Sequence, residues 1–168
     1  RGRAISRPPS KVLENIRQVV ENGFKEVVIT GVNIGRYDYE GMSLRELLEK
    51  ILDLPGEFRL RISSLEPDGF GPEFHQLFHH PKMMPHLHLC IQSGSDAILR
   101  RMRRMYTVQE FRDIVHSFRK AIPDFNFTTD IIVGFPGTIC STWQQAGRAG
   151  SDGRALARCH PQRAGCRC

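Results

Sequence analysis

Apolar residues recur along the first 137 positions with two alternating periods. Apolar side chains three and four positions apart predict helices, whereas short β-branched runs that end in glycine or a polar turn predict buried strands of a parallel sheet. The predicted helices cover 12–20, 44–52, 72–78, 96–105 and 108–121. The predicted strands cover 26–30, 58–62, 87–91 and 127–133.

Local signals support several of these boundaries. Gly23 ends the first helix, and Pro55 with Gly56 ends the second. Ser43, followed three positions later by Glu46, predicts a capping box at the start of the second helix. Helices that alternate with strands imply a parallel sheet covered by helices, either a doubly wound sheet or part of a βα barrel. The fold class is therefore α/β.

The alternation stops after Gly137. Residues 138–168 show no sustained period and are rich in Gly, Ala and Arg, so we expect them to be disordered and to form a tail separate from the domain at 1–137. The domain carries 19 basic and 17 acidic residues, and the tail supplies most of the net charge of +6. Overall charge is therefore weak support for nucleic-acid binding.

No apolar stretch reaches the length of a membrane span, and the first residues lack the apolar run of a secretory signal. We therefore expect the chain in the cytoplasm.

Each predicted strand ends in a polar or glycine-bearing turn. Because the carboxyl ends of parallel strands meet at one edge of a sheet, we expect these turns to line one site for a small polar molecule such as a nucleoside or an amino acid. The candidate residues are Gly31, Asn33, Ser63, Ser64, Glu66, Gln92, Ser93, Gly94, Asp130, Gly134 and Pro136. The alternative is that they are ordinary βα turns, which favour the same residue types.

An arginine-rich run follows the third strand, with Arg100, Arg101, Arg103 and Arg104 in a helix for which Ser95 is a plausible N-cap. One interpretation is a solvated helix face, because the apolar residues of this helix lie on a different face. The other is phosphate contact with RNA or with a phosphate-bearing ligand. The sequence leaves both open.

No metal ligands are predicted. His86 and His88 share one face of a strand, but no carboxylate lies nearby in sequence, so they favour no metal site. Cys90, two positions further on, is interpreted as a packing residue. Four further cysteines lie in the tail, together with His160, at spacings that do not match a paired C-x2-C arrangement. These are Cys140, Cys159, Cys166 and Cys168.

Four segments together resemble the radical SAM methylthiotransferases. They are TGVNIGRYDYEG, RISSLEP, HLHLCIQSGSDAILRRMRRMYTVQEF and TTDIIVGFPG, in this order and spacing. The resemblance covers residues 1–137 and is strongest to the bacterial branch that modifies threonylcarbamoyladenosine in tRNA. Glycines scattered over four strand ends, rather than gathered in one G-x-G-x-x-G turn, disfavour a Rossmann-type methyltransferase.

The resemblance implies an incomplete parallel (βα)6 partial barrel that binds S-adenosylmethionine (SAM) and a four-iron cluster at its strand ends. It also implies a 5′-deoxyadenosyl radical that abstracts hydrogen from adenine C2, a second cluster that supplies sulfur, and tRNA as the partner. The eleven strand-end residues named above occupy, by position, the segments that line the family's SAM pocket.

The sequence also departs from the family. The C-x3-C-x2-C loop that holds the cluster belongs upstream of the RGRAISRPP segment and is not in this chain, so we expect the first strand and the cluster loop to be missing and the isolated chain to be inactive. After Gly137 the family continues with Glu-Thr and an acidic helix, whereas this chain continues with Thr138, Ile139 and Cys140, as a shifted reading frame would produce. The family's RNA-binding TRAM domain is not in this chain.

Two hypotheses follow. The chain is a fragment of a tRNA-modifying enzyme, or it is a non-catalytic remnant that binds SAM, nucleoside or RNA. An incomplete barrel exposes sheet edges, so self-association is also expected.

Overall fold

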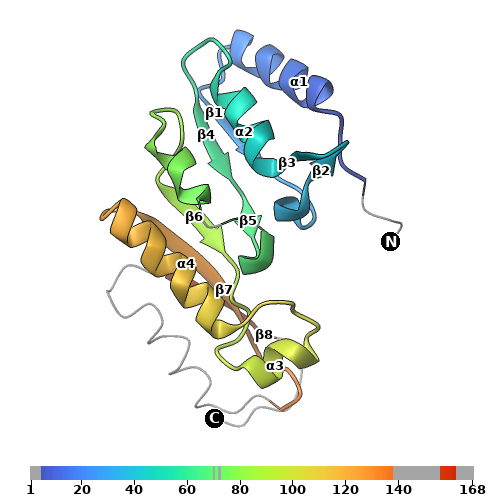
Figure 1. The fold of residues 1–168 in the computed structure, drawn as a ribbon, viewed down its shortest axis with the longest axis vertical. Helices are drawn as coiled ribbons and strands as arrows, with labels where there is room; N and C mark the ends of the chain where they lie inside the picture. Colours follow the sequence, from blue (N-terminus) through green and yellow to red (C-terminus); the bar gives the residue numbers. More distant parts are fainter. Residues whose placement is uncertain (1–4, 70, 72, 138–155, 162–168) are drawn as a thin grey trace. The chain divides into compact units, whose positions relative to one another are not determined.

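The computed structural model describes residues 5–69, 71, 73–137 and the backbone of 156–161. It divides into two compact units, the first formed by residues up to 65 and by 69–85, and the second by 66–68 and the residues from 86 onward. In chain order the elements are α1 (Pro9–Glu21), β1 (Glu26–Ile29), η1 (Ile34–Arg36), β2 (Asp38–Tyr39), β3 (Met42–Ser43), α2 (Leu44–Leu52), β4 (Arg59–Ile62), β5 (Ser64–Leu65), η2 (Pro67–Gly69), η3 (Phe74–His79), β6 (His86–Leu89), α3 (Asp96–Arg101), α4 (Val108–Ala121), β7 (Asn126–Val133) and β8 (Leu156–Pro161) (Figure 1). The α/β class is confirmed.

The first unit is built on the parallel pair β1–β4, in which Val27 lies opposite Leu60. Helix α2 begins with the predicted capping box, because Ser43 Oγ accepts from the Glu46 amide and Glu46 Oε2 accepts from the Ser43 amide. Its buried face consists of Leu44, Leu47, Leu48, Ile51 and Leu52. The pattern of apolar residues therefore predicted both the position and the buried face of α2.

Two expectations for the first unit are corrected. The strand at 26–30 was expected to be buried, yet Val28 is 48% exposed, because β1 pairs with β4 alone and only Val27 is buried along it. The segment at 72–78 is not an α-helix: η3 is a 3-10 helix that buries Phe74, Leu77 and Phe78. Short 3-10 segments of this kind are frequent as connectors between elements.

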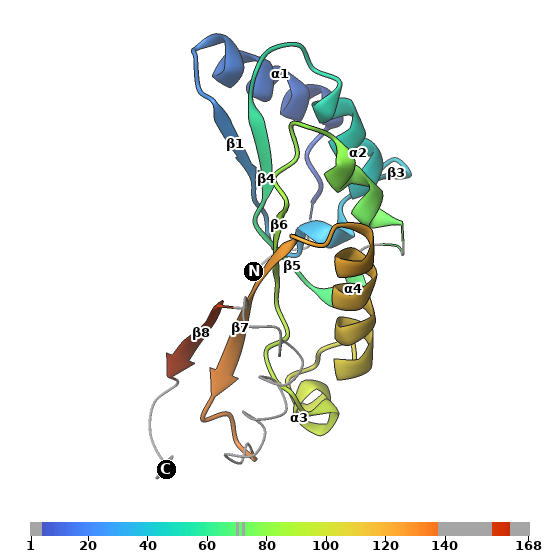
Figure 2. The ribbon, with the colours of Figure 1, turned by 90° about the vertical axis from the view of Figure 1, so that its left-hand side faces the viewer.

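The second unit contains the parallel strands β6, β7 and β8, with β7 between the other two. Leu87 lies opposite Phe127 and His88 opposite Thr128. Helix α4 covers one face of β7 (Figure 2), where the ring centroids of Phe118 and Phe127 lie 5.6 Å apart. Thr107 and Glu110 form a second capping box at the start of α4.

Helix α3 ends earlier than the apolar pattern predicts. It was expected to reach residue 105, but Arg103 adopts a left-handed conformation (φ 57°), and the chain leaves the helix there. The Arg104 amide donates to the Leu99 carbonyl and the Arg103 amide to the Arg100 carbonyl, which is a Schellman termination. Glycine usually occupies this position, so an arginine there carries no sequence signal for the end of the helix.

Within the segment 138–168, for which disorder is expected, the structure describes one strand. Strand β8 pairs in parallel with β7, with Thr128 opposite Leu156 and Val133 opposite Pro161. Backbone groups alone can extend an open sheet edge, so this pairing needs no apolar pattern in the added segment. Residues 138–155 and 162–168 lie outside the described part of the chain. Within that part, no helix is long and apolar enough to cross a membrane.

We predict that Arg103→Gly makes the chain more stable than Arg103→Ala by about 1 kcal/mol, because glycine adopts the left-handed conformation without a Cβ penalty. Both variants remove the same charge, so the difference isolates the backbone effect. Urea denaturation followed by circular dichroism gives the two free energies of unfolding. Equal stabilities would show that Arg103 does not carry strain.

Candidate functional site

The second unit has one apolar and one polar sheet face. Along β6 the alternate residues Leu87 and Leu89 are fully buried, on the side that Phe127 shares with α4. His86 and His88 point to the opposite face, together with Thr128 and Asp130 of β7. Successive side chains of a strand point to opposite faces, so packing against α4 fixes the direction of the polar set.

Hydrogen bonds connect the polar face. Thr128 Oγ1 lies 3.1 Å from His86 Nε2 and 2.8 Å from His88 Nδ1. His88 Nε2 lies 3.3 Å from Asp130 Oδ2. The other oxygen, Asp130 Oδ1, is buried and has no hydrogen-bond partner among the described residues. A buried carboxylate oxygen without a partner is costly and indicates a place where a ligand donor or a cation fits.

The end of β6 is tied to β7 through Gln92. The Gln92 amide donates to the Asp130 carbonyl at 2.9 Å, and the Gln92 carbonyl accepts from the Ile132 amide at 2.8 Å. Gln92 adopts a left-handed conformation (φ 62°), which turns the chain into Ser93 and Gly94. The structure therefore brings together Gln92 and Asp130, two of the residues predicted from the sequence.

Ser93 is 3% exposed, and its Oγ accepts from the Ser95 amide at 3.3 Å. Ser95 is the residue before α3, but its side chain makes no capping hydrogen bond. Gly134 has φ 75° just after β7, and Pro136 is exposed. These residues shape the two strand ends through the backbone more than through their side chains.

Glu66, the remaining predicted residue of this unit, pairs with Arg104. Both side chains are about three-quarters buried, whereas Arg100, Arg101 and Arg103 are exposed. Arg104 therefore follows neither interpretation of the arginine run, and the exposure of the other three arginines is compatible with both. Arg104 is an internal partner of a carboxylate, and the other three form the solvated part.

Two further groups near this pair are held neutral by burial. Desolvation, together with the charges of Asp130 and Glu66, raises the pKa of the Cys90 thiol to about 11. Desolvation also raises the pKa of Tyr106, whose hydroxyl lies 3.5 Å from the Ile91 carbonyl oxygen. The unliganded Cys90 is therefore a thiol, not a thiolate, at neutral pH.

The predicted residues of the first unit lie at the ends of β1 and β4. Gly31, Asn33 and Ser64 are exposed, and Asn33 has a left-handed backbone (φ 52°). The Ser63 amide donates to the Ile29 carbonyl at 2.9 Å, so Ser63 lies beside the end of β1. Ser63 Oγ is buried without a hydrogen-bond partner among the described residues.

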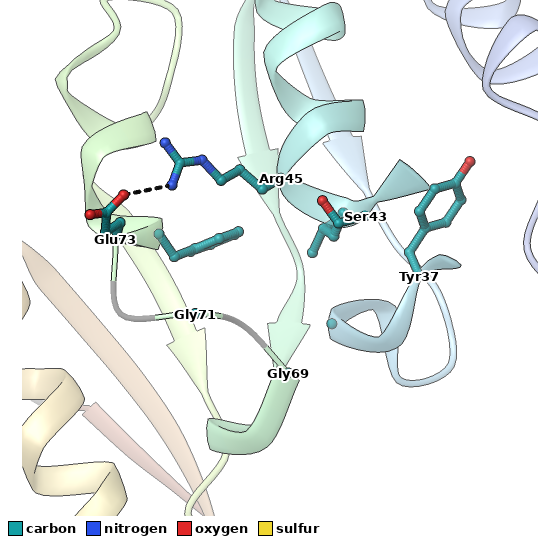
Figure 3. Close-up of a pocket in the computed structure, with 9 residues that line it drawn as sticks. Tyr37, Ser43, Arg45, Gly69, Gly71 and Glu73 are labelled. Carbon is teal, nitrogen blue, oxygen red and sulfur yellow. Dashed lines mark hydrogen bonds and ion pairs between the residues drawn. The ribbon is translucent and has the colours of Figure 1, made fainter. Parts of the chain in front are cut away.

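The first unit also contains a cavity of ≈ 370 Å³ that the sequence did not predict (Figure 3). None of the eleven predicted residues lines it. Arg45 and Glu73 line the cavity and pair with each other at 3.3 Å. Arg45 also pairs with Glu49 at 2.9 Å, so the charged side chains of the cavity already have partners. Gly35 and Gly69 also line it, and a Cβ on Gly35 would lie 2.6 Å from Gly69 Cα. That close approach explains the second glycine of the TGVNIGR segment.

Sequence comparison identifies the class of protein to which this chain belongs. The family model of the radical SAM superfamily matches residues 1–143, and the chain is a member of that superfamily. Its relatives include threonylcarbamoyladenosine tRNA methylthiotransferases, one from Chlamydia pneumoniae (46% identical over 82% of this chain) and one from Thermotoga maritima (43% over 86%). A tRNA-2-methylthio-N(6)-dimethylallyladenosine synthase from Anaeromyxobacter sp. (strain K) is 41% identical over 82% of this chain. The matches cover 33%, 34% and 30% of these three proteins, so the chain spans about a third of their length.

We predict that Arg104→Met lowers the free energy of unfolding by about 1–2 kcal/mol, between the values for exposed and fully buried ion pairs, because Glu66 loses its partner. Arg100→Met, at an exposed position, should change it by less than about 0.5 kcal/mol. Adding Glu66→Gln to Arg104→Met should restore part of the loss. Urea denaturation measures all four proteins, and equal effects of the two arginine substitutions would contradict a structural role for Arg104.

Proposed function

We propose that this chain is the central part of a radical SAM enzyme that adds a methylthio group to C2 of the adenine in threonylcarbamoyladenosine of tRNA. The superfamily membership and the names of the relatives support the reaction class. We assign threonylcarbamoyladenosine because the relatives at 46% and 43% identity carry that name, whereas relatives of both names occur at 40–41%. We propose that the enzyme acts in the cytoplasm and that its radical SAM domain is a partial barrel. We also propose that the isolated chain self-associates.

The observation that carries this proposal is the junction of Gln92 with Asp130 at the ends of β6 and β7. SAM carries a sulfonium and an ammonium group together with hydrogen-bonding adenosine and carboxylate groups. The buried Asp130 Oδ1 lacks a hydrogen-bond partner among the described residues, so it suits a donor or a positive charge of such a molecule, and the Gln92 amide group can both donate and accept. When bound, SAM supplies the 5′-deoxyadenosyl radical.

The chain's own residues bind and orient this cofactor. We assign the side chain of Gln92 and the backbone of Gly94 to contacts with its polar groups, and Ser93 to holding the turn through the Ser95 amide. For the first unit, the resemblance implies cofactor-contact roles for Gly31, Asn33, Ser63 and Ser64, and we keep these roles as part of the proposal. Packing of α4 against the apolar face keeps water from one side of the sheet.

The iron–sulfur cluster does not fit the residues of this chain. Within residues 5–69, 71 and 73–137 the structure holds one cysteine, Cys90, buried in the strand region. The tail cysteines are not spaced as C-x3-C-x2-C. We therefore assign no step to a cluster held here, and we expect its ligands in the parts of the relatives that lie outside the matched third.

A segment exchange tests the proposed function. Residues 5–137 of this chain replace the matched segment of the Bacillus subtilis threonylcarbamoyladenosine tRNA methylthiotransferase, to which the chain is 40% identical over 141 residues. The chimera is expressed in cells that lack that gene, and tRNA nucleosides are analysed by liquid chromatography and mass spectrometry. We expect 2-methylthio-N6-threonylcarbamoyladenosine to appear.

Two variants of the chimera sharpen this test. Gln92→Ala should reduce both SAM binding and the methylthiolated nucleoside, whereas Gln109→Ala, exposed on α4, should leave both unchanged. A chimera that accumulates as soluble, SAM-binding protein and leaves threonylcarbamoyladenosine unmodified would contradict the assigned function. Unchanged SAM binding by Gln92→Ala would contradict the assigned contact.

A further inference from the structure

Three side chains with metal-ligating atoms meet on the polar face of β6 and β7. They are His88 on β6, Cys90 directly after β6, and Asp130 on β7. Their ligand atoms all lie within 4.8 Å of one another. The sequence did not predict this group, because the carboxylate is forty positions away and reaches the histidine only through the register of β6 with β7. The group lies outside the residues to which cofactor contacts were assigned, except for Asp130.

The separations suit a small cation. In tetrahedral coordination, with bonds of about 2.0–2.3 Å, neighbouring ligand atoms are about 3.3–3.8 Å apart. His88 Nε2 and Asp130 Oδ2 are already 3.3 Å apart. A rotation of the Cys90 side chain is therefore the main adjustment that coordination requires.

The surroundings of the group also suit a cation. Cys90 is 7% exposed, whereas the side chains of His88 and Asp130 are 22% and 27% exposed, so the group is mostly buried but partly open to solvent. The buried Asp130 Oδ1 lacks a hydrogen-bond partner within the described residues. Oδ2 is the oxygen that faces His88, so a cation bound there would offset the partly buried charge of this carboxylate and leave Oδ1 for the cofactor contact proposed above.

A neighbouring hydroxyl orients the histidine. Thr128 Oγ1 lies 2.8 Å from His88 Nδ1. When Nδ1–H donates to this hydroxyl, the lone pair of Nε2 faces Asp130 and is available to a metal. Metal-binding histidines almost always have such an outer partner, and it fixes the tautomer.

We propose that His88, Cys90 and Asp130 form a mononuclear site for a divalent transition metal of the zinc class, with three protein ligands and one open position. Imidazole and thiolate ligands favour Zn²⁺ and Co²⁺ over Mg²⁺ and Ca²⁺, which prefer oxygen. Binding replaces the Cys90 thiol proton with the metal ion, and the proton is released to solvent. None of its ligands belongs to a C-x3-C-x2-C motif, and the site does not depend on the proposed tRNA reaction.

Cobalt titration of the 168-residue chain, under reducing and anaerobic conditions, tests this site. Co²⁺ bound to a thiolate gives a ligand-to-metal charge-transfer band in the near ultraviolet together with visible bands of tetrahedral geometry. The reference protein carries Ser in place of Cys140, Cys159, Cys166 and Cys168, so that only Cys90 can supply sulfur. We expect both sets of bands in the reference protein, and we expect Zn²⁺ to displace the cobalt.

Variants of the reference protein separate the ligands from their neighbours. Cys90→Ser should abolish the charge-transfer band, and His88→Gln and Asp130→Asn should each weaken cobalt binding at least tenfold. Thr128→Val should weaken it about tenfold, as loss of an outer partner does. His86→Gln, which changes a histidine on the same face outside the group, should leave cobalt binding unchanged.

The proposal is wrong if the bands disappear when the four tail cysteines are replaced, because the tail then binds the cobalt. It is also wrong if the reference protein binds cobalt equally well with and without His88→Gln and Asp130→Asn. Far-ultraviolet circular dichroism of each variant shows whether it is folded. His88→Gln and Asp130→Asn affect partly exposed side chains, so they test the site even if Cys90→Ser unfolds the chain.

Discussion

The pairing of β6 with β7 under helix α4 is the constraint on which the candidate site depends. Phe118 packs against Phe125 and Phe127, with ring centroids 4.9 and 5.6 Å apart, so one sheet face is committed to the core. A shift of one residue in the register would bury the histidines and expose the leucines. The packing of α4 therefore decides that His88 and Asp130 share the other face.

Much of the fold follows from local sequence signals. The capping boxes at Ser43 and Thr107 and the apolar faces behind them depend on residues close in sequence. The bounds predicted for α2 and α4 are therefore those that the structure has. The end of α3 was not, because Arg103 takes a conformation that glycine usually signals. Strand β8 was missed for a different reason, since it joins β7 through backbone groups that every residue has.

The sequence allows a prediction of candidate site residues where these depend on the ends of single strands. Gln92, Ser93 and Gly94 were recognised from their position after an apolar run, and the structure shows how Gln92 joins the neighbouring strand. The pairing of Glu66 with Arg104, and of His88 with Asp130, could not be predicted, because each depends on contacts between residues about forty positions apart. The same strand pair thus carries both the proposed cofactor contacts and the proposed metal site.

The most direct measurement of the central claim is hydrogen–deuterium exchange of the cluster-loaded chimera with and without SAM. If the ends of β6 and β7 bind the cofactor, the amides of residues 93–95 and 133–135 should exchange more slowly when SAM is present, because bound ligand suppresses local opening. The central claim would be contradicted if exchange at both strand ends is unchanged and SAM protects only the residues that line the first unit's cavity, such as Arg45 and Glu73.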